Sequence, residues 1–419
     1  MNILFIGSLD LQYPSRDGGV RRMLPLLEHI RKKRHKVIMV VPTMKSRDES
    51  GVFENFPVYH VGPARRKVLQ SSYYFSGISL AVKTFIKIKK LVKINNIDVI
   101  YAFNPTLICG FPGYFAAKFC HKPLVLEMND LVMNLGIEAG VFQPKSVLTK
   151  LGLLVQNKLP LHANMVITTN FINKMLLSQG MSPEKITVIP MAADIENFHP
   201  QKNGAIIRQR YGLSNAMIIL YQGAVRTAFG IGVLLDAIAV VSQNTQTELK
   251  CLIVGFHRNR EVEFDQDDEI ISLKNKSKHL GINDSVIFTG PQPHEEIPDF
   301  IAAADICVNP APYTIVHRAA SPAKVFEYMA VGKPVISTNL ESVANIIIDG
   351  ETGLLAEPNE QSLAERILWL IENPAQRAII GRKAREKVVA EYQWEKLGDK
   401  LIDAFKHTVA NYHNYPENT

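Results

Sequence analysis

Short apolar runs rich in Val and Ile alternate with longer amphipathic segments along most of the chain. Runs of this length, separated by segments of helical periodicity such as 20–33 and 80–94, predict strands of a parallel sheet covered by helices. The same rhythm occurs twice. The first series of predicted strands covers 2–7, 36–42, 98–103, 123–128 and 164–169, and the second covers 217–223, 249–255, 285–290, 306–311 and 334–338.

A stretch containing several Pro and Asn residues, 188–204, lies between the two series and predicts a linker. The sequence from 373 onward is helical in pattern and too long to cap one domain, so part of it is expected to cross back onto the first domain. The predicted fold class is α/β, with two Rossmann-like, doubly wound parallel-sheet domains facing each other across a cleft. We expect an N-terminal domain over 1–195, a C-terminal domain over 196–385, and C-terminal helices over 386–419 that pack on the N-terminal domain.

The composition is that of a folded protein, since 47% of the 419 residues are hydrophobic and 21% are charged. The four cysteines have no C-x-x-C spacing and lie in apolar surroundings, which predicts reduced, buried thiols and neither a zinc site nor disulfides. The first apolar run is typical of a buried strand rather than a signal peptide, and no run approaches the roughly 20 apolar residues of a membrane span. We therefore expect a cytoplasmic protein.

The net charge of +7 is concentrated in the first half of the chain. Residues 1–200 contain 25 Lys and Arg against 13 Asp and Glu, whereas the remainder contains 22 against 27. The excess lies in three basic clusters, 31–36, 64–67 and 83–93, and in the last of these Lys is interleaved with apolar residues. Such a helix either lies on an anionic membrane surface or packs on the protein with a solvated lysine face. Three clusters in one half favour peripheral membrane contact, and no aromatic-interleaved basic groove indicates nucleic acid.

The stretch ASPAKVFEYMAVGKPVIST, residues 320–338, predicts a short helix followed by a buried strand. Ser321 is a good N-cap, Pro322 suits the first helical position, and Gly332 suits a left-handed end. The free N–H groups after Ser321 form an anion site, and Glu327, about one turn inside, can accept hydroxyl protons from a sugar. This arrangement fits a phosphate and a ribose. An ordinary surface helix with a Ser-Pro cap is the alternative.

Glycines follow several of the predicted strands. Gly18 and Gly19 precede a predicted helix, and Gly223 and Gly255 end strands of the second series. In open α/β sheets ligands bind outside the carboxyl ends of the strands, where glycine lets the backbone approach a phosphate closely. Each glycine alone is compatible with a simple turn, whereas their joint placement favours a nucleotide site.

Seven segments, in order along the chain, carry a family resemblance: the Gly18-Gly19 loop, VIPMAADIENFHP, ILYQGAVRTAFGIGVLLDAI, VIFTGPQPHEEIPDFIAAADICVNPA, SPAKVFEYMAVGKPVI, DGETGLLAEP and YQWEKL. Together they resemble the retaining family 4 glycosyltransferases of the GT-B fold, and the resemblance covers nearly the whole length. It implies transfer of a sugar from a nucleotide sugar with retention of anomeric configuration, without a bound metal or other cofactor. The donor would lie mainly on the second domain and the acceptor on the first.

The resemblance also implies roles for single residues. Glu327 matches the second glutamate of the family's E-x7-E motif, which holds the donor ribose, whereas the first glutamate falls on Ala319. In place of that motif, a subset of the family has the form SP-x-K-x-x-EY, in which the backbone around Ala320 is expected to contact the phosphate or the sugar. This chain matches that form at Ser321, Pro322, Lys324, Glu327 and Tyr328.

A second departure concerns the diphosphate. The family's G-R-L-x-x-x-K-G segment places a cationic pair there, and this chain has Ala224 and Phe229 at those positions. Without a metal, cations and helix N-termini must stabilise the charge that grows on the departing nucleoside diphosphate. Arg226 in the same loop is the predicted substitute, with a plain solvent-exposed arginine as the alternative. The next candidates are Arg318, His317 and Lys324.

On the acceptor side, VLEMNDL places Glu127, Asn129 and Asp130 at the end of a predicted strand. Asp130 either orients an acceptor hydroxyl or caps the following helix. We assign no general base, because in a retaining reaction the leaving phosphate oxygen can itself take the acceptor proton.

These observations predict a retaining hexosyltransferase with a UDP- or GDP-linked sugar as donor and a lipid-linked or glycan acceptor. It would act in surface polysaccharide or glycoconjugate synthesis, at the inner face of the cytoplasmic membrane. The alternative is a catalytically silent GT-B protein that binds a nucleotide sugar or partners another transferase. A sugar-nucleotide epimerase or a phosphorylase of the same fold is a further alternative.

Overall fold

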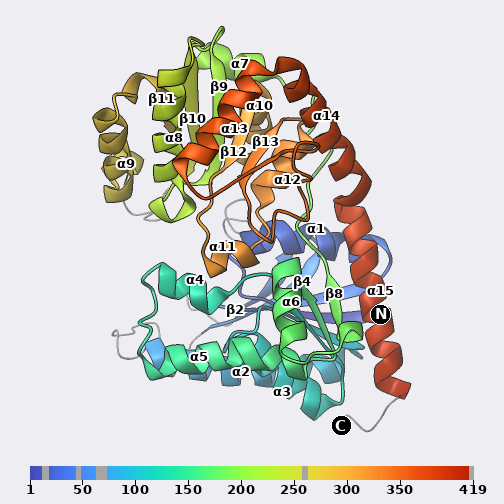
Figure 1. Ribbon diagram of the computed structural model, residues 1–419. Coiled ribbons are helices and arrows are strands. Elements are labelled where there is room, and N and C mark those ends of the chain that lie inside the picture. Colours follow the sequence, from blue (N-terminus) through green and yellow to red (C-terminus); the bar gives the residue numbers. More distant parts are fainter. Residues whose placement is uncertain (12–17, 44–48, 63–72, 257–262, 415–419) are drawn as a thin grey trace. The chain divides into compact units, whose positions relative to one another are not determined.

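The computed structural model describes residues 1–11, 18–43, 49–62, 73–256 and 263–414. They form two compact units (Figure 1). The N-terminal unit comprises Met1–Pro190 together with the segment from Trp394, and the C-terminal unit comprises Met191–Gln393. The chain changes units within the predicted linker. It returns after the helix α14 (Pro374–Glu391), so the returning segment is α15 (Trp394–Asn414).

The N-terminal unit is built on an eight-stranded sheet with the order β3-β4-β2-β1-β5-β6-β7-β8. All pairs are parallel except β3 with β4, so the expected parallel sheet has one antiparallel edge strand. The order reverses between β1 and β5, which is a topological switch point. The strands are β1 (Asn2–Ile6), β2 (Lys36–Pro42), β3 (Glu49–Phe53), β4 (Phe56–Val61), β5 (Val99–Phe103), β6 (Leu124–Met128), β7 (Met165–Thr168) and β8 (Ile186–Val188).

The C-terminal unit has a six-stranded, wholly parallel sheet with the order β11-β10-β9-β12-β13-β14. This is the strand order of a dinucleotide-binding Rossmann sheet, and its switch point lies between β9 and β12. All ten strands predicted from the apolar runs are confirmed. The strands are β9 (Met217–Ala224), β10 (Leu249–Phe256), β11 (Val286–Gly290), β12 (Ile306–Asn309), β13 (Val335–Thr338) and β14 (Leu354–Ala356).

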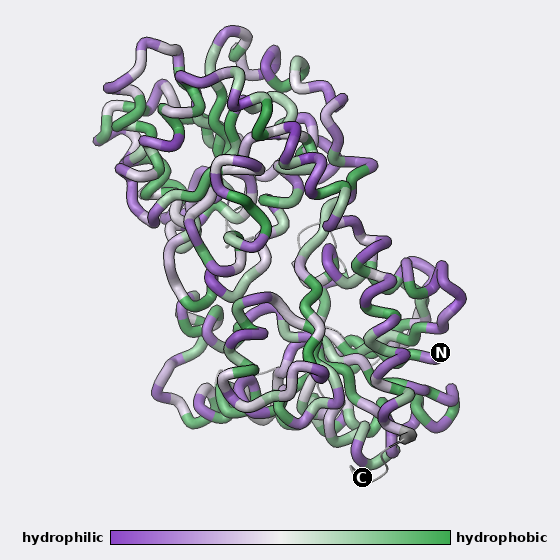
Figure 2. Tube along the Cα trace, turned by 45° about the vertical axis from the view of Figure 1, so that its right-hand side comes forward, coloured by the Kyte–Doolittle hydropathy of each residue, from purple (hydrophilic) through white to green (hydrophobic). Residues whose placement is uncertain are grey.

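Helices cover both sheets, because each parallel connection must cross over a face of the sheet. Figure 2 shows hydrophobic residues concentrated along the strands inside each unit and hydrophilic residues on the outer helix faces and turns. The helices of the N-terminal unit, besides α15, are α1 (Gly18–Lys32), α2 (Tyr73–Ile94), α3 (Gly110–Cys120), α4 (Val132–Glu138), α5 (Val147–Lys158) and α6 (Asn170–Ser178). Those of the C-terminal unit, besides α14, are α7 (Gly204–Arg210), α8 (Ile231–Asn244), α9 (Asp268–His279), α10 (Ile297–Ala303), α11 (Ile315–Ala319), α12 (Ala323–Ala330) and α13 (Glu360–Glu372).

The C-terminal helix α15 belongs to the N-terminal unit, whereas the predicted returning segment began at 386, inside α14, which stays with the C-terminal unit. It packs along α1 (Figure 1). Phe405 of α15 is fully buried and meets the ring of Tyr101 on β5 edge-on, with the ring centroids 5.0 Å apart. The side chain of His29 on α1 is hydrogen-bonded to Asp399 at 2.8 Å. The last helix is therefore part of the N-terminal core.

The predicted buried cysteines are confirmed at Cys109, Cys251 and Cys307, whereas the prediction was wrong at Cys120, which is only half-buried; all four thiols are free. Burial raises the pKa of the Cys109 thiol to about 11 and that of Cys251 to about 12, so both stay protonated at neutral pH. Within the described ranges, no helix combines the length and the apolar character that crossing a bilayer requires.

Candidate functional site

The carboxyl ends of β9 and β10 meet at two glycines, Gly223 and Gly255, which are partners in the strand register. Their φ angles are 136° and 153°, a region that side-chain-bearing residues rarely adopt. A Cβ on Gly255 would lie 1.7 Å from the Gly223 carbonyl oxygen. Glycine is therefore required at 255 for the two strand ends to stay side by side.

Helix α12 is fixed to the end of β9 by hydrogen bonds from Gln222. Its backbone N–H donates to the Tyr328 hydroxyl oxygen over 2.7 Å, and its side-chain amide donates to the Glu327 carboxylate. Glu327 and Tyr328 are both buried. The carboxylate predicted to hold a ribose thus lies beside the switch-point strand of a Rossmann sheet, where nucleotides bind in this architecture.

The start of α12 differs from the prediction. The helix begins at Ala323, and the residue at its N-cap position is Pro322, without a side-chain cap. The Ser321 hydroxyl instead accepts the N–H of Met191 over 3.0 Å, so its use as the helix cap was wrong. The Ala320 N–H donates to the Val316 carbonyl, which ends α11. The end of α12 is as predicted, because Gly332 has a φ of 76°.

Lys324 lies in the first turn of α12, with its ammonium against the end of β9. The Nζ atom is 4.1 Å from the centroid of the Tyr221 ring and 5.7 Å from that of Phe229. A Cβ on Gly223 would lie 3.1 Å from the same Nζ atom, so the glycine leaves room for the ammonium. Burial lowers the pKa of Lys324 to about 7 from its ordinary 10.5. This cation is stabilised by aromatic rings and is short of solvation, a state that favours an incoming anion.

The loop after β9 packs over this lysine. Phe229 belongs to the 3-10 helix η5 (Thr227–Phe229) and meets the His317 ring edge-on at 5.3 Å. The His317 imidazole is hydrogen-bonded to the Ala228 carbonyl over 2.8 Å. Burial lowers the pKa of His317, and the nearby charge of Lys324 lowers it further, so this imidazole is neutral at pH 7. Of the His317 imidazole and the Lys324 side chain, only Lys324 therefore brings positive charge to the site.

The two arginines predicted at the diphosphate have acidic partners in the structure. Arg226 is mostly buried, and its Nε lies 3.4 Å from the Glu269 carboxylate on α9. Arg318 donates to both carboxylate oxygens of Glu341, with Nε at 3.0 Å from each, and its guanidinium stacks 4.7 Å from the Tyr313 ring centroid. The alternative of a plain solvent-exposed Arg226 is wrong. The Arg226 contact is long for a charged pair, whereas Arg318 is held firmly by Glu341.

In the N-terminal unit, Gly18 and Gly19 form the first residues of α1, and a Cβ on Gly18 would meet no atom of the described residues within 4 Å. Residues 12–17, directly before them, lie outside the described ranges, so the close backbone approach at these glycines stays a prediction. On the same helix Arg22 is buried, and its guanidinium donates to Glu127 and to the carbonyls of Ile189 and Pro190.

Asp130 follows β6, close to this buried arginine. Burial raises the pKa of the Asp130 carboxyl, and the charge of Arg22 opposes that rise. The residue at the N-cap position of α4 is Leu131, so the alternative in which Asp130 caps that helix was wrong. Glu127 is fully buried and bonded to Arg22 and Asn129, which makes it part of the scaffold beneath the strand end.

The structure therefore brings Gly223, Gly255, Lys324 and Glu327 together at one switch point of the C-terminal unit. Sequence reasoning missed Gln222, although its position directly before the strand-end Gly223 was a usable signal. It also missed Arg22, Glu269 and Glu341, because their partners lie 105, 43 and 23 residues away and no local pattern marks them.

Two family models match the chain. The model described as Glycosyltransferase Family 4 matches residues 16–197, and the model described as Glycosyl transferases group 1 matches residues 205–387. A D-inositol 3-phosphate glycosyltransferase of Rhodococcus jostii is 25% identical over 74% of this chain and 66% of its own length. The mannosylfructose-phosphate synthase of Agrobacterium fabrum is 26% identical over 57% of this chain and 52% of its own length. The chain thus matches less than two thirds of the length of either relative.

Solved structures share the whole fold. Sucrose-phosphate synthase from Thermosynechococcus elongatus superimposes with a TM-score of 0.76 at 20% identity, over 98% of this chain and all of its own. Anabaena HepE in complex with UDP and glucose superimposes with a TM-score of 0.72 at 20% identity, over 97% of this chain and all of its own. The paired matches to the two family models and the shared architecture lead to one conclusion: the chain belongs to the family 4, group 1 glycosyltransferases and has the GT-B fold.

Proposed function

We propose that this protein transfers a hexose from a UDP- or GDP-linked sugar, with retention of configuration, to a lipid-linked or glycan acceptor. The product would enter surface polysaccharide or glycoconjugate synthesis. The proposal is supported by family membership and by the names of the similar proteins. HepE has been solved with UDP-glucose, and several relatives are named as D-inositol 3-phosphate glycosyltransferases.

The observation that carries the proposal is the pairing of Lys324 and Glu327 at the end of β9. The ammonium stands beside Gly223, where a diphosphate can approach the strand end closely. The Glu327 carboxylate lies one helical turn away and accepts from Gln222. A carboxylate has about four lone-pair sites, so it can also accept ribose hydroxyls. One cation and one carboxylate at this spacing suit the two ends of a nucleoside diphosphate.

In the proposed reaction the bond between the anomeric carbon and the diphosphate oxygen breaks, and its electron pair stays on that oxygen. Lys324 stabilises the charge that develops there, with Arg226 as a second cation. The acceptor hydroxyl forms the new bond on the face that the diphosphate leaves. Its proton passes to the departing phosphate oxygen, so the atoms and charges balance without a separate base. On the acceptor side we propose that Asp130 orients the acceptor hydroxyl. We further propose that the backbone of Gly18 and Gly19 lies close to a phosphate of the nucleotide sugar.

The test is turnover of a donor panel. The purified protein is incubated with UDP- and GDP-hexoses, and the release of nucleoside diphosphate is measured with and without acceptor candidates. Proton NMR of the product reports whether the anomeric configuration is retained. Glu327→Gln serves as the matched variant, because it keeps the shape of the side chain and removes its charge.

A silent GT-B protein is the second candidate, and one observation favours it. Phe229 and Ala224 stand where the family has its cationic pair, and Ala319 stands where it has a glutamate. This candidate predicts nucleotide binding by calorimetry and no nucleoside diphosphate release from any donor. Release that depends on Glu327 would exclude it.

A further inference from the structure

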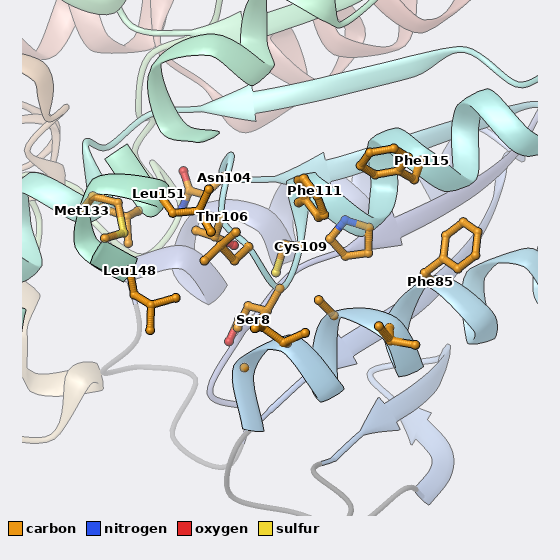
Figure 3. Close-up of a pocket in the computed structure, with 18 of the residues that line it drawn as sticks. Ser8, Phe85, Asn104, Thr106, Cys109, Phe111, Phe115, Met133, Leu148 and Leu151 are labelled. Carbon is orange, nitrogen blue, oxygen red and sulfur yellow. The ribbon is translucent and has the colours of Figure 1, made fainter. Parts of the chain in front are cut away.

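A large apolar cavity of about 780 Å³ lies within the N-terminal unit. Its walls come from α2, α3, α4 and α5, and Figure 3 shows Phe111 and Phe115 of α3 across from Phe85 of α2. Met133 of α4 and Leu151 of α5 lie at the other end of the view. Packed interiors leave few voids larger than a water molecule, whereas ligand pockets span about 300–1,000 Å³. The size and lining of this cavity therefore indicate a binding site for a hydrocarbon group.

The cavity reaches the switch point of the N-terminal sheet. Ser8 follows β1 and Asn104 follows the neighbouring strand β5, and both residues line the cavity (Figure 3). The Asn104 Oδ1 atom is buried and accepts no hydrogen bond from any residue that the structure describes. A buried acceptor in this state calls for a donor group from a ligand. The polar end of the cavity thus lies at the strand ends where ligands of such sheets bind, and the apolar part extends away beneath the helices.

The helices around the cavity also expose apolar side chains. Ile78 and Val82 on α2 are 55% and 53% exposed, and Leu151 on α5 is 41% exposed. All three side chains also line the cavity, so exposed apolar surface is continuous with its interior. Exposed apolar surface that leads into a cavity marks an interaction site.

The charge next to the cavity is positive. Helix α2 contains five lysines and no acidic residue. Its inner face, with Leu80, Ile88 and Leu91, is buried, so α2 packs on the protein. Three of its lysines, Lys89, Lys90 and Lys93, are exposed, whereas Lys83 donates to the Gly62 carbonyl. The exposed Lys89 lies 5.5 Å from the Phe85 ring and 5.6 Å from the Phe119 ring, and both rings line the cavity. A lysine-bearing helix face beside an apolar cavity is complementary to a hydrocarbon chain that is drawn from an anionic lipid surface.

We propose that this cavity holds the hydrocarbon chain of the acceptor, an amphipathic lipid drawn from an anionic bilayer. The polar head of the lipid lies at Ser8 and Asn104, and the α2 lysines face the anionic headgroups of the bilayer. This inference rests on the proposed transferase function and narrows its acceptor to the lipid-linked class.

The experiment measures binding of cis-parinaric acid, a fluorescent fatty acid, to the full chain. Ala81→Phe places a ring inside the cavity, and Ile86→Phe adds the same ring on the exposed side of the same helix as a control. A second pair tests the opposite wall with substitutions at exposed positions, which a folded protein tolerates. Leu151→Glu places a carboxylate in the cavity wall, and Leu154→Glu places one on the same helix outside it.

We expect saturable binding to the parent, at least tenfold weaker binding to Ala81→Phe and Leu151→Glu, and parent-like binding to both controls. Absence of saturable binding to the parent, or equal losses in both members of each pair, overturns the inference. Titration of the same samples with UDP and with GDP reports on the donor site separately. Loss of fatty-acid binding with nucleotide binding retained in the cavity variants supports two distinct sites. A parent that binds the fatty acid but neither UDP nor GDP keeps the cavity assignment and refutes the proposed transferase function.

Discussion

Lys324→Met should remove a proton-linked step from nucleotide binding. In the free protein, burial lowers the pKa of this ammonium to about 7, so the side chain is mostly neutral above that pH. A diphosphate beside Nζ stabilises the charged form and raises the pKa again. Binding above neutral pH must therefore draw one proton onto Lys324, and the affinity must fall as the pH rises.

The magnitude follows from the pKa. At pH 7 about half of the lysines are charged, and at pH 9 about one per cent are, so the affinity for UDP should fall about 50-fold between these pH values. The UDP phosphate does not offset this, because its own ionisation, with a pKa of about 6, is complete over most of this range. At pH 8 the uptake should be roughly 0.9 proton per UDP bound. Lys324→Met should bind more weakly at pH 7 and show neither the pH dependence nor the uptake.

Titration calorimetry in two buffers of different ionisation enthalpy measures the affinity and the proton uptake together. Lys333→Met is the matched control, because Lys333 is another lysine of the same unit whose pKa burial lowers, and its Nζ donates to the Ala302 carbonyl. The control should keep the parent's pH dependence. Equal UDP affinity of the parent at pH 7 and pH 9, without proton uptake, would refute the role of Lys324.

Four further predictions follow from the same geometry. Glu327→Ala should weaken UDP binding by about 1–3 kcal/mol in calorimetry, the loss expected for charged hydrogen bonds. Arg226→Ala should lower the turnover number roughly 10²-fold with a smaller change in donor affinity, because the cation acts on charge that grows in the transition state. Lys324→Met should raise the melting temperature at pH 7, and this gain should shrink as the pH rises toward 10.5. The pKa of Lys324 is lower in the folded protein than in the unfolded chain, so its protonation destabilises the folded state at pH values below the unfolded pKa of 10.5. Replacing four α2 lysines together by Gln should release the protein from anionic liposomes in co-sedimentation, at about 1 kcal/mol per charge; they are Lys87, Lys89, Lys90 and Lys93.

Each of these has a result that contradicts it. Unchanged UDP affinity with an intact fold would remove Glu327 from the ribose. A near-normal turnover number for Arg226→Ala would move its role to Lys324 alone. Equal melting temperatures for Lys324→Met and the parent at pH 7 would show that the ammonium carries no desolvation penalty. Equal sedimentation of the lysine variant at low salt would remove α2 from the membrane surface.

The sequence predicted the strands well because a strand buried on both faces must be a short apolar run, whatever its partners are. It missed β8 and β14, which have only three residues each, and also β3 and β4. The last two form a hairpin closed by Glu54 and Asn55, whose φ angles are 46° and 69°. Two positive φ angles are typical of a tight hairpin turn, but the usual signal for one is Asn-Gly or Asp-Gly, and Glu in the first position conceals it. Exposed Val52 also breaks the expected apolar alternation of β3.

The candidate site was predictable only in part. Glu327 and Lys324 follow from helix periodicity and the resemblance, because both lie on one short helix. The role of Ser321 could not be predicted, because its hydroxyl accepts a hydrogen bond from the N–H of Met191, 130 residues earlier in the chain. Local sequence shows that a serine suits a cap, and tertiary contacts decide whether the hydroxyl is available for it.

The departures at 224 and 229 acquire a physical explanation from the position of Lys324. The family places positive charge on the loop after this strand, and here the loop contributes the Phe229 ring instead. The Phe229 ring and the Tyr221 ring both contact the ammonium of Lys324. The loop thus stabilises, by cation–π contact, a cation that helix α12 supplies. Moving the cation into this partly buried place lowers its pKa to about 7, which a bound diphosphate would reverse. The charged fraction of Lys324 is therefore lowest when the site is empty and highest when a phosphate is bound. In the proposed transfer, the charge missing from the loop is replaced by that of Lys324, which becomes fully protonated when the donor binds.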